Sequence, residues 1–259
     1  MSSNPRVNPT HVWKQEIIDT YFPKTPIEIG DQIKQSDTKH DKTVVHIMAR
    51  SRSTRLADKN IKPLCGVPLL AYTIIIAREM GADMILVDTD SKEYAKIANK
   101  YGAETPYLRP KELALDDTPP GLPVYYAQKR LLQKGYPVKT WVTMYPTSPF
   151  RNVHRTRKYY EILQKSGSLF TVFAPRVSFD TTPCLDREKP AGCHEDSMIF
   201  FKRTGNMLGS HLQLDELKWR HCEILNNPIE LIDIDTDADF KLATSVIEAN
   251  AYDFGVSIC

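Results

Sequence analysis

Residues 43–60 read TVVHIMARSRSTRLADKN, an apolar run that passes directly into a basic loop. Thr43–Ala49 is rich in β-branched and other apolar side chains, as expected for a strand buried on both faces of a sheet. Downstream, helical patterns at 68–80, 91–101, 124–133 and 152–165 alternate with strand-like runs at 84–87, 140–145 and 169–174. This alternation predicts an α/β fold with a doubly wound, mainly parallel sheet.

The rest of the chain is predicted to be organised differently. Residues 1–42 are polar and contain four prolines, so we expect an N-terminal extension and linker with one short helix at 11–21. The main domain is predicted over 43–250. Within it, 175–225 is expected to be an irregular excursion for partner contact or acceptor binding, with a strand-like run at 198–202. A strand-like run at 231–235, a helix at 237–249 and a C-terminal tail at 251–259 complete the prediction.

Composition excludes several classes of protein. The 259 residues contain 34 Lys and Arg against 32 Asp and Glu, a net charge of +2, which argues against an electrostatically driven nucleic-acid-binding protein. The five cysteines include no CxxC pair and favour a reduced compartment over a disulfide scaffold. No secretory pattern is seen, and no apolar run approaches the ~20 residues of a membrane helix. We therefore expect a cytoplasmic protein without nucleic-acid or membrane partners.

The loop after the first strand concentrates positive charge. It holds four basic side chains against one acid, Asp58, with hydroxyl groups between them; the basic residues are Arg50, Arg52, Arg55 and Lys59. Guanidinium groups bind phosphate oxygens in pairs, and ammonium groups complete such sites. In doubly wound sheets, ligands bind beyond the carboxyl ends of strands, where this loop begins. The loop therefore favours a polyphosphate site, although it lacks GxxxxGK[ST], and a solvated charged loop is the alternative.

A second chemical feature is IDIDTDADF at residues 232–240. On a strand, Asp233 and Asp235 would project to one face while the isoleucines face the core. Two carboxylates at this spacing suit Mg²⁺, which prefers oxygen ligands. The alternative is that Asp235 caps the following helix and Asp239 lies in its first turn. Asp88 and Asp90, at the end of the second strand, are secondary candidates for metal or ribose contacts.

Four short segments of the sequence matter for their order along the chain. They are residues 50–60 together with PLCGVPLLAYT at 63–73, LRPKELA at 108–114, YPTSPFR at 145–151 and IDIDT at 232–236. In this order and spacing they resemble the acylneuraminate cytidylyltransferases, the CMP-sialic acid synthetases. Each segment alone is a weak signal, but the four together are specific and cover about residues 43–250.

The resemblance implies an enzyme that moves CMP from CTP to a hydroxyl of a nonulosonic, sialic acid-like keto-acid sugar and releases pyrophosphate. It also implies a nucleotide-diphospho-sugar transferase-like fold, a homodimer, and Mg²⁺ (or Mn²⁺) held by Asp233 and Asp235. The implied catalytic residues are Arg50, Lys59 and Asp235. The implied nucleotide-binding residues, with Asn60 at the cytosine, are Arg50, Ser53, Arg55, Lys59, Asn60, Arg109, Tyr145 and Thr147.

Departures from the family pattern lie mostly where the acceptor is expected. Arg52-Ser53-Thr54 stands in place of Gly-Ser-Lys, so Arg55 is the expected substitute for a missing lysine. Tyr145 replaces a glutamine, Pro119-Pro120-Gly121 replaces serines, and Asp196-Ser197 replaces Asn-Gly. Two alternatives therefore stay open. One is a cytidylyltransferase for a different, non-sialic acceptor, and the other is a nucleotide-binding relative without catalysis.

Overall fold

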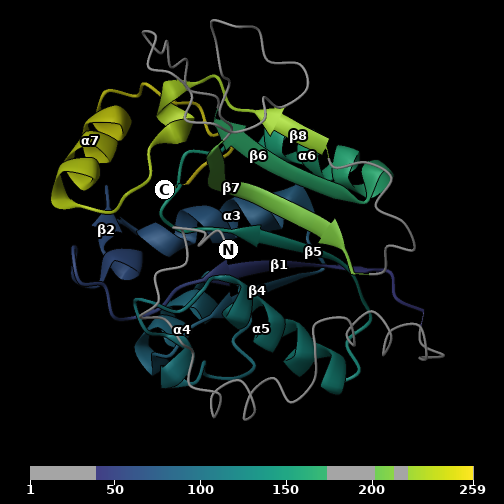
Figure 1. Ribbon diagram of the computed structural model, residues 1–259. Coiled ribbons are helices and arrows are strands. Elements are labelled where there is room, and N and C mark those ends of the chain that lie inside the picture. Colours follow the sequence, from purple (N-terminus) through teal and green to yellow (C-terminus); the bar gives the residue numbers. More distant parts are fainter. Residues whose placement is uncertain (1–38, 174–201, 213–220, 259) are drawn as a thin grey trace, which may run out of the picture.

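The computed structural model describes residues 39–173, 202–212 and 221–258. Its main sheet has the strand order β4-β1-β5-β7-β6-β8 (Figure 1). The strands are β1 (Lys42–Met48), β4 (Met84–Asp88), β5 (Val138–Met144), β6 (Ser168–Phe173), β7 (Lys202–His211) and β8 (His221–Ile224). Strand β7 runs antiparallel to both neighbours, and the other pairs are parallel. The predicted mainly parallel sheet is confirmed.

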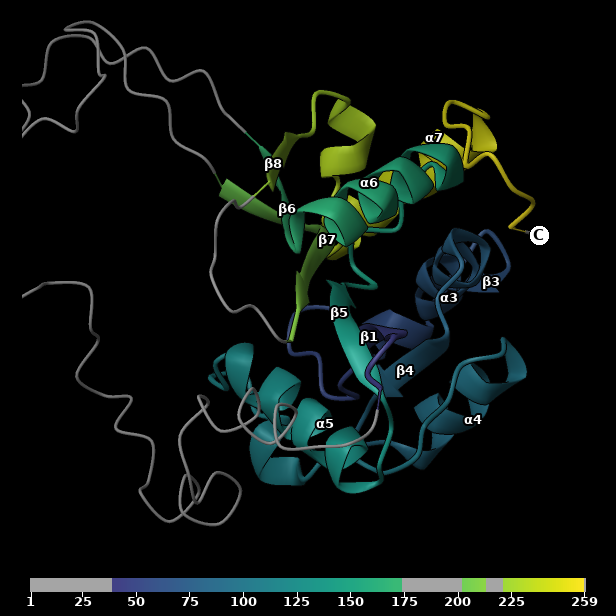
Figure 2. The ribbon, with the colours of Figure 1, turned by 90° about the vertical axis from the view of Figure 1, so that its right-hand side faces the viewer.

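Helices cover both faces of this sheet (Figure 2). One face packs against α3 (Leu69–Met80), α4 (Lys92–Lys100) and α6 (Val153–Ser166), and the other packs against α5 (Gly121–Gln133). In β1, Val45 and Ile47 join the core beneath α3, α4 and α6, whereas Val44 joins the core beneath α5. Because successive side chains of a strand point to opposite faces, this apolar strand requires cover on both sides.

Polar side chains cap the beginning of helices α4 and α7. Ser91 accepts a hydrogen bond from the Tyr94 N–H and caps α4, as its place in the sequence predicted. Thr236 caps α7 (Asp237–Glu248), and Asp239 completes a capping box with the Thr236 backbone. The alternative in which Asp235 caps this helix is therefore wrong, and its carboxylate is available for other contacts.

Strand β7 lies within the stretch that was expected to be irregular. Its sequence, KRTGNMLGSH, has little β-character, yet the strand pairs with both β5 and β6. A Cβ at Gly205 would lie 2.5 Å from Cδ2 of Tyr145, and one at Gly209 would clash with Leu163. Side chains of other elements thus fill the space beside both glycines. Residues 198–201 of the predicted strand, and the predicted helix at 11–21, lie outside the described residues.

The predicted strand at 231–235 is not formed. A short 3-10 helix, η3 (Pro228–Leu231), is followed by an extended segment that belongs to no sheet. Ile234 is fully buried, and its N–H donates to the Thr147 carbonyl at 2.7 Å. The alternation of isoleucine and aspartate therefore reflects burial of one side of the segment, and not pairing with a strand.

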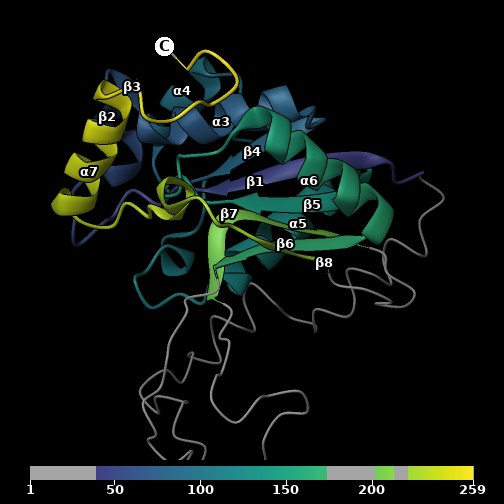
Figure 3. The same ribbon diagram turned by 90° about the horizontal axis from the view of Figure 1, so that it is seen from above.

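A small apolar cluster joins α7 to the rest of the fold. Helix α7 packs beside the hairpin of β2 (Pro63–Leu64) and β3 (Val67–Pro68), as Figure 3 shows. Residues 251–258, which were predicted as a tail, pack here too, with the Tyr252 and Phe254 rings 5.3 and 5.9 Å from the Phe150 ring. No helix among the described residues is long and apolar enough to cross a membrane.

Candidate active site

A cavity of about 260 Å³ lies at the carboxyl ends of β1 and β5. Residues from three distant segments of the chain line it, and they include seven of the eight predicted nucleotide-binding residues: Arg50, Ser53, Lys59, Asn60, Arg109, Tyr145 and Thr147. Leu113, Leu115, Pro120 and Pro123 give another part of the wall an apolar surface. The structure therefore brings these predicted residues together, while their individual roles stay predictions.

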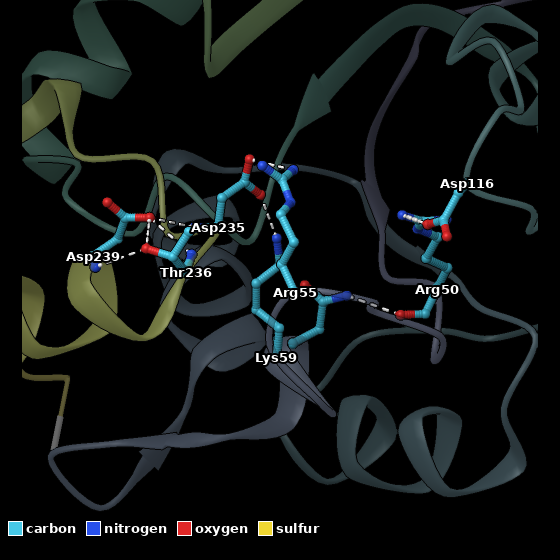
Figure 4. Close-up of polar contacts among 8 residues, drawn as sticks. Arg50, Arg55, Lys59, Asp116, Asp235, Thr236 and Asp239 are labelled. Atoms are coloured by element: carbon cyan, nitrogen blue, oxygen red, sulfur yellow. Dashed lines mark hydrogen bonds and ion pairs between the residues drawn. The ribbon is translucent and has the colours of Figure 1, made fainter.

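An adjoining cavity of about 280 Å³ contains the remaining predicted residue, Arg55. The two cavities share Arg50, Ser53, Lys59 and Asp116. Asp235 contacts two of the basic side chains of this cavity. Its Oδ1 accepts a hydrogen bond from Lys59 Nζ at 2.6 Å, and its Oδ2 accepts one from Arg55 Nη2 at 2.8 Å (Figure 4). The lining carries three basic side chains and two carboxylates, so it is positively charged.

The Asp235 carboxylate is held in its ionised form. Burial, the largest single effect, opposes ionisation, but the hydrogen bond and charge of Lys59 together with the charge of Arg55 outweigh it. The pKa of Asp235 is therefore below its usual value. An ionised carboxylate accepts hydrogen bonds only and can bind a hard cation through either oxygen.

The basic loop is anchored at both ends. Asp90 accepts from the Ser51 N–H and from the Ser51 hydroxyl, both at 2.8 Å. Tyr94 donates to Asp58 at 3.1 Å, and Asn60 Nδ2 donates to the Arg50 carbonyl at 3.0 Å. Both carboxylate oxygens of Asp90 thus position the loop, and its suggested contact with metal or ribose stays a prediction. These bonds fix the backbone that carries the cations of the cavity.

Beneath the first cavity, Asp88, Arg109 and His46 form a buried network. Arg109 donates from Nε to Asp88 Oδ2 at 3.0 Å and from Nη2 to the Asp88 carbonyl at 2.9 Å. His46 Nε2 lies 3.2 Å from the same Asp88 oxygen. Burial opposes ionisation of Asp88, but Arg109 and His46 together lower the pKa of this aspartate. Asp88 is fully buried and holds Arg109 in the cavity wall, and its suggested contact with metal or ribose stays a prediction.

Three side chains that line the first cavity each have a buried polar atom without a hydrogen-bond partner among the described residues. These atoms are Arg50 Nη1, Asn60 Oδ1 and Thr118 Oγ1. Buried polar atoms are nearly always satisfied, because leaving one unpaired costs about 1–3 kcal/mol. These three are among ten such atoms in the described part of the chain, and their place on the cavity wall leaves hydrogen-bonding capacity for a polar ligand.

Arg151, which the sequence analysis did not single out, ties the cavity wall together. It is almost completely buried and donates to the carbonyl oxygens of Tyr145, Gly205 and Asn206 at 2.7–2.9 Å. Burial lowers its pKa to about 9, so the guanidinium stays charged at neutral pH. The last residue of the YPTSPFR segment thus fixes the Tyr145 backbone against β7.

The two predicted metal ligands are placed differently. Asp235 lines the second cavity, whereas Asp233 is exposed and lines neither of the two cavities. The charge of Asp233 acts instead on Tyr145 and Arg151. A carboxylate that sequence reasoning missed, Asp116, lies on both cavities and forms an ion pair with Arg50 at 2.5 Å. The available signal was the acidic pair Asp116-Asp117 shortly after LRPKELA.

Comparison with known proteins confirms the predicted family. A family model described as cytidylyltransferase matches residues 44–252. The CMP-N,N'-diacetyllegionaminic acid synthase of Legionella pneumophila is 31% identical over 224 residues, which cover 79% of this chain and 95% of that protein. The N-acylneuraminate cytidylyltransferase of Escherichia coli is 29% identical over 225 residues, which cover 79% of this chain and 52% of that protein.

Solved structures support the fold. A CMP:2-keto-3-deoxy-manno-octonic acid synthetase complexed with CTP superposes with a TM-score of 0.57 at 12% identity, covering 81% of this chain and 100% of that one. A 4-diphosphocytidyl-2C-methyl-D-erythritol synthase from Anaerococcus prevotii gives 0.55 at the same identity and coverage. At this identity the likeness concerns the fold alone, and the sequence relatives carry the family assignment. The chain belongs to the cytidylyltransferase family and is an enzyme of the nucleotidyltransferase type.

Proposed function

We propose that this chain transfers CMP from CTP to a hydroxyl of a nonulosonic, sialic acid-like keto-acid sugar, releases pyrophosphate and depends on Mg²⁺. The observation that carries the proposal is the convergence of the basic loop, Arg109 and residues 145–147 on the first cavity, to which the loop contributes Arg50, Ser53, Lys59 and Asn60. The class of acceptor is supported by relatives named for N,N'-diacetyllegionaminic acid, N-acylneuraminate and pseudaminic acid.

The triphosphate is assigned to the second cavity. Arg50, Arg55 and Lys59 line it, and all three belong to the anchored loop after β1. Transfer of a nucleotidyl group requires the attacking and leaving oxygens to be in line and the charge on the leaving pyrophosphate to be neutralised. Fixed cations meet the second need without reorganising during the reaction.

The base is assigned to the first cavity. Asn60 uses its Nδ2 on the Arg50 carbonyl, so its buried Oδ1 has an unmet capacity to accept a hydrogen bond. The exocyclic amino group of cytosine is a donor of the required kind, whereas uracil offers a carbonyl at that place. Arg109 is held rigid by Asp88 and presents a fixed positive wall. These features support a preference for CTP over UTP.

The Asp235 carboxylate on the second cavity fits a divalent cation, because it is ionised and lies where the phosphates are assigned. Asp233, two residues away on the same extended segment, lines neither cavity, and its assignment as a second ligand rests on the resemblance alone. Asp235 and Asp233 would hold the ion, which would supply charge neutralisation at the phosphates. Lys59 and Arg55 orient the Asp235 carboxylate for this task through their hydrogen bonds.

The proposal is tested with the purified chain, CTP, Mg²⁺ and a panel of acids comprising diacetyllegionaminic, N-acetylneuraminic, pseudaminic and 2-keto-3-deoxy-manno-octonic acid. We expect pyrophosphate release and a CMP-sugar product with at least one acid, and loss of both when Mg²⁺ is chelated. Omission of the acceptor is the control for hydrolysis. CTP binding without pyrophosphate release from any acid would indicate a relative that has lost catalysis, and absence of CTP binding would refute the nucleotide assignment.

We also propose that the enzyme is a homodimer. The support is the resemblance described above, and much of the 175–225 region expected to contact the partner lies outside the described residues. Light scattering on a sizing column gives the mass directly. A mass near 60 kDa is expected, from the chain mass of 29.6 kDa, and a monomeric mass would contradict the proposal.

A further inference from the structure

Asp116 is the one carboxylate that lines both cavities, and the proposed chemistry gives it no role. It lies in the loop between η2 (Lys111–Leu113) and α5, and its Oδ1 is 2.5 Å from Arg50 Nη2 (Figure 4). Its side chain is 52% exposed, and that of Arg50 is 31% exposed, so the pair faces the cavities and is not buried in the core. A negative charge therefore stands where phosphate oxygens are expected.

The contact has two consequences for an anionic ligand. Phosphate oxygens that approach Arg50 must compete with Asp116 for the same guanidinium group, and they are repelled by the carboxylate itself. Asp235 has the same relation to Lys59 and Arg55. Each of these three cations of the cavity is thus already paired with a carboxylate before a nucleotide enters.

A divalent cation changes this balance. Magnesium bound to the phosphates cancels part of their charge and attracts nearby carboxylates, so the repulsion from Asp116 falls while the cations still bind. We propose that Asp116 determines specificity for the magnesium-bound form of the triphosphate, because its carboxylate occupies Arg50 and disfavours the metal-free nucleotide. This inference rests on the proposed binding of CTP. Its effect is to keep the site from filling with unreactive, metal-free CTP.

The test measures CTP binding by calorimetry without acceptor, once in EDTA and once in excess Mg²⁺. For Asp116→Asn we expect metal-free CTP to bind about twofold to fivefold more tightly than to the unmodified chain, the range for an ion pair of this exposure. The affinity for CTP in excess Mg²⁺ is expected to change less. The ratio of the affinity in Mg²⁺ to the affinity in EDTA should therefore be smaller in Asp116→Asn than in the unmodified chain. Asp116→Ala, which also removes the acceptor oxygen, is expected to shift in the same direction.

The matched control is Asp117→Asn. It removes the same charge from the neighbouring residue, whose side chain lines neither cavity. Its preference for the magnesium form should equal that of the unmodified chain. Weaker CTP binding by Asp116→Asn in both conditions would mean that Asp116 only orients Arg50, and an unchanged preference would overturn the inference alone. If the unmodified chain binds no CTP in either condition, the proposed function fails and the inference fails with it.

Discussion

Lys59 Nζ donates to Asp235 Oδ1 at 2.6 Å, although the two residues are 176 positions apart in the chain. The Lys59 side chain is only 11% exposed, so this contact is shielded from solvent more than a typical surface ion pair. It joins the loop after β1 to the segment before α7, and thereby unites the two features that carry most of the predicted chemistry. The cation assigned to phosphate and the carboxylate assigned to metal are neighbours.

The first prediction concerns Asp235→Asn. The substitution retains shape but removes the charge that we assign to the metal, so kcat should fall by about 100-fold or more. CTP affinity should change by no more than about threefold, because Lys59 and Arg55 are still present. Steady-state kinetics and calorimetry give the two values.

Asp237→Asn is the control for this change. Asp237 is a nearby exposed aspartate that pairs with Lys241 at 2.9 Å on α7, away from both cavities. Its kcat should remain within about twofold of the unmodified chain. Equal losses of turnover and CTP affinity in Asp235→Asn would show a structural role for that residue.

The second prediction concerns Asp88→Asn. Arg109 is 5% exposed, and its guanidinium would be left buried without a counter-charge. Removal of one partner from a buried pair costs about 3–5 kcal/mol in the free energy of unfolding. Urea denaturation measures this value. The control is Asp83→Asn, which removes the partner of Lys42 in an exposed ion pair beside the start of β4 and should lower the free energy of unfolding by about 1 kcal/mol or less. Similar losses of stability in the two variants would contradict the role of Asp88 as the buried partner of Arg109.

The third prediction is a pH dependence from His46. Burial, opposed in part by Asp88, lowers the pKa of His46 below 6.5, so the unfolded chain takes up a proton before the folded chain does. The stability from this neutral histidine is therefore complete above pH 6.5 and is lost as the pH falls below it. Between pH 6.5 and 5, the free energy of unfolding should depend less steeply on pH in His46→Gln than in the unmodified chain. The difference in slope should be up to about 1.4 kcal/mol per pH unit. Parallel slopes in the two proteins would show that His46 does not titrate differently on folding.

The fourth prediction compares two glycines of β7. In Gly205→Ala the new Cβ meets Tyr145 and Ser148, which must shift in or beside the cavity wall. Stability should fall by about 1–3 kcal/mol and kcat/KM by about tenfold or more. Gly209→Ala meets Leu163 instead, so it should lose similar stability with kcat/KM within about twofold. Equal kinetic losses would mean that the position of Tyr145 does not matter.

Much of the fold could be predicted because local patterns and local structure agree. Ser91 stands before a helical pattern and caps α4, and the apolar run at 43–49 becomes a strand with helices over both faces. The cavity could also be anticipated, since carboxyl ends of neighbouring parallel strands share one edge of a sheet. These inferences require only the identity of residues close together in the chain.

The misses have a common physical cause. Strand β7 forms because β5 and β6 offer hydrogen-bonding edges on either side of it. Two of its positions are glycine because the side chains of Tyr145 and Leu163, which are distant in the sequence, fill the space where a Cβ would lie. The segment 231–235 alternates as a strand would, yet its buried face packs on the core without a sheet partner. In both cases the partner and not the local propensity decided the structure.

The sequence by itself determined the strand–helix alternation, the basic loop after β1 and the family, because each depends on residue types at fixed short spacings. Only the tertiary structure decided which carboxylate pairs with which cationic side chain. Asp88 is withdrawn into the core to hold Arg109, Asp235 is brought to Lys59, and Asp116 is placed on Arg50. Charges interact through space over a few ångströms, and sequence separation carries no information about that distance.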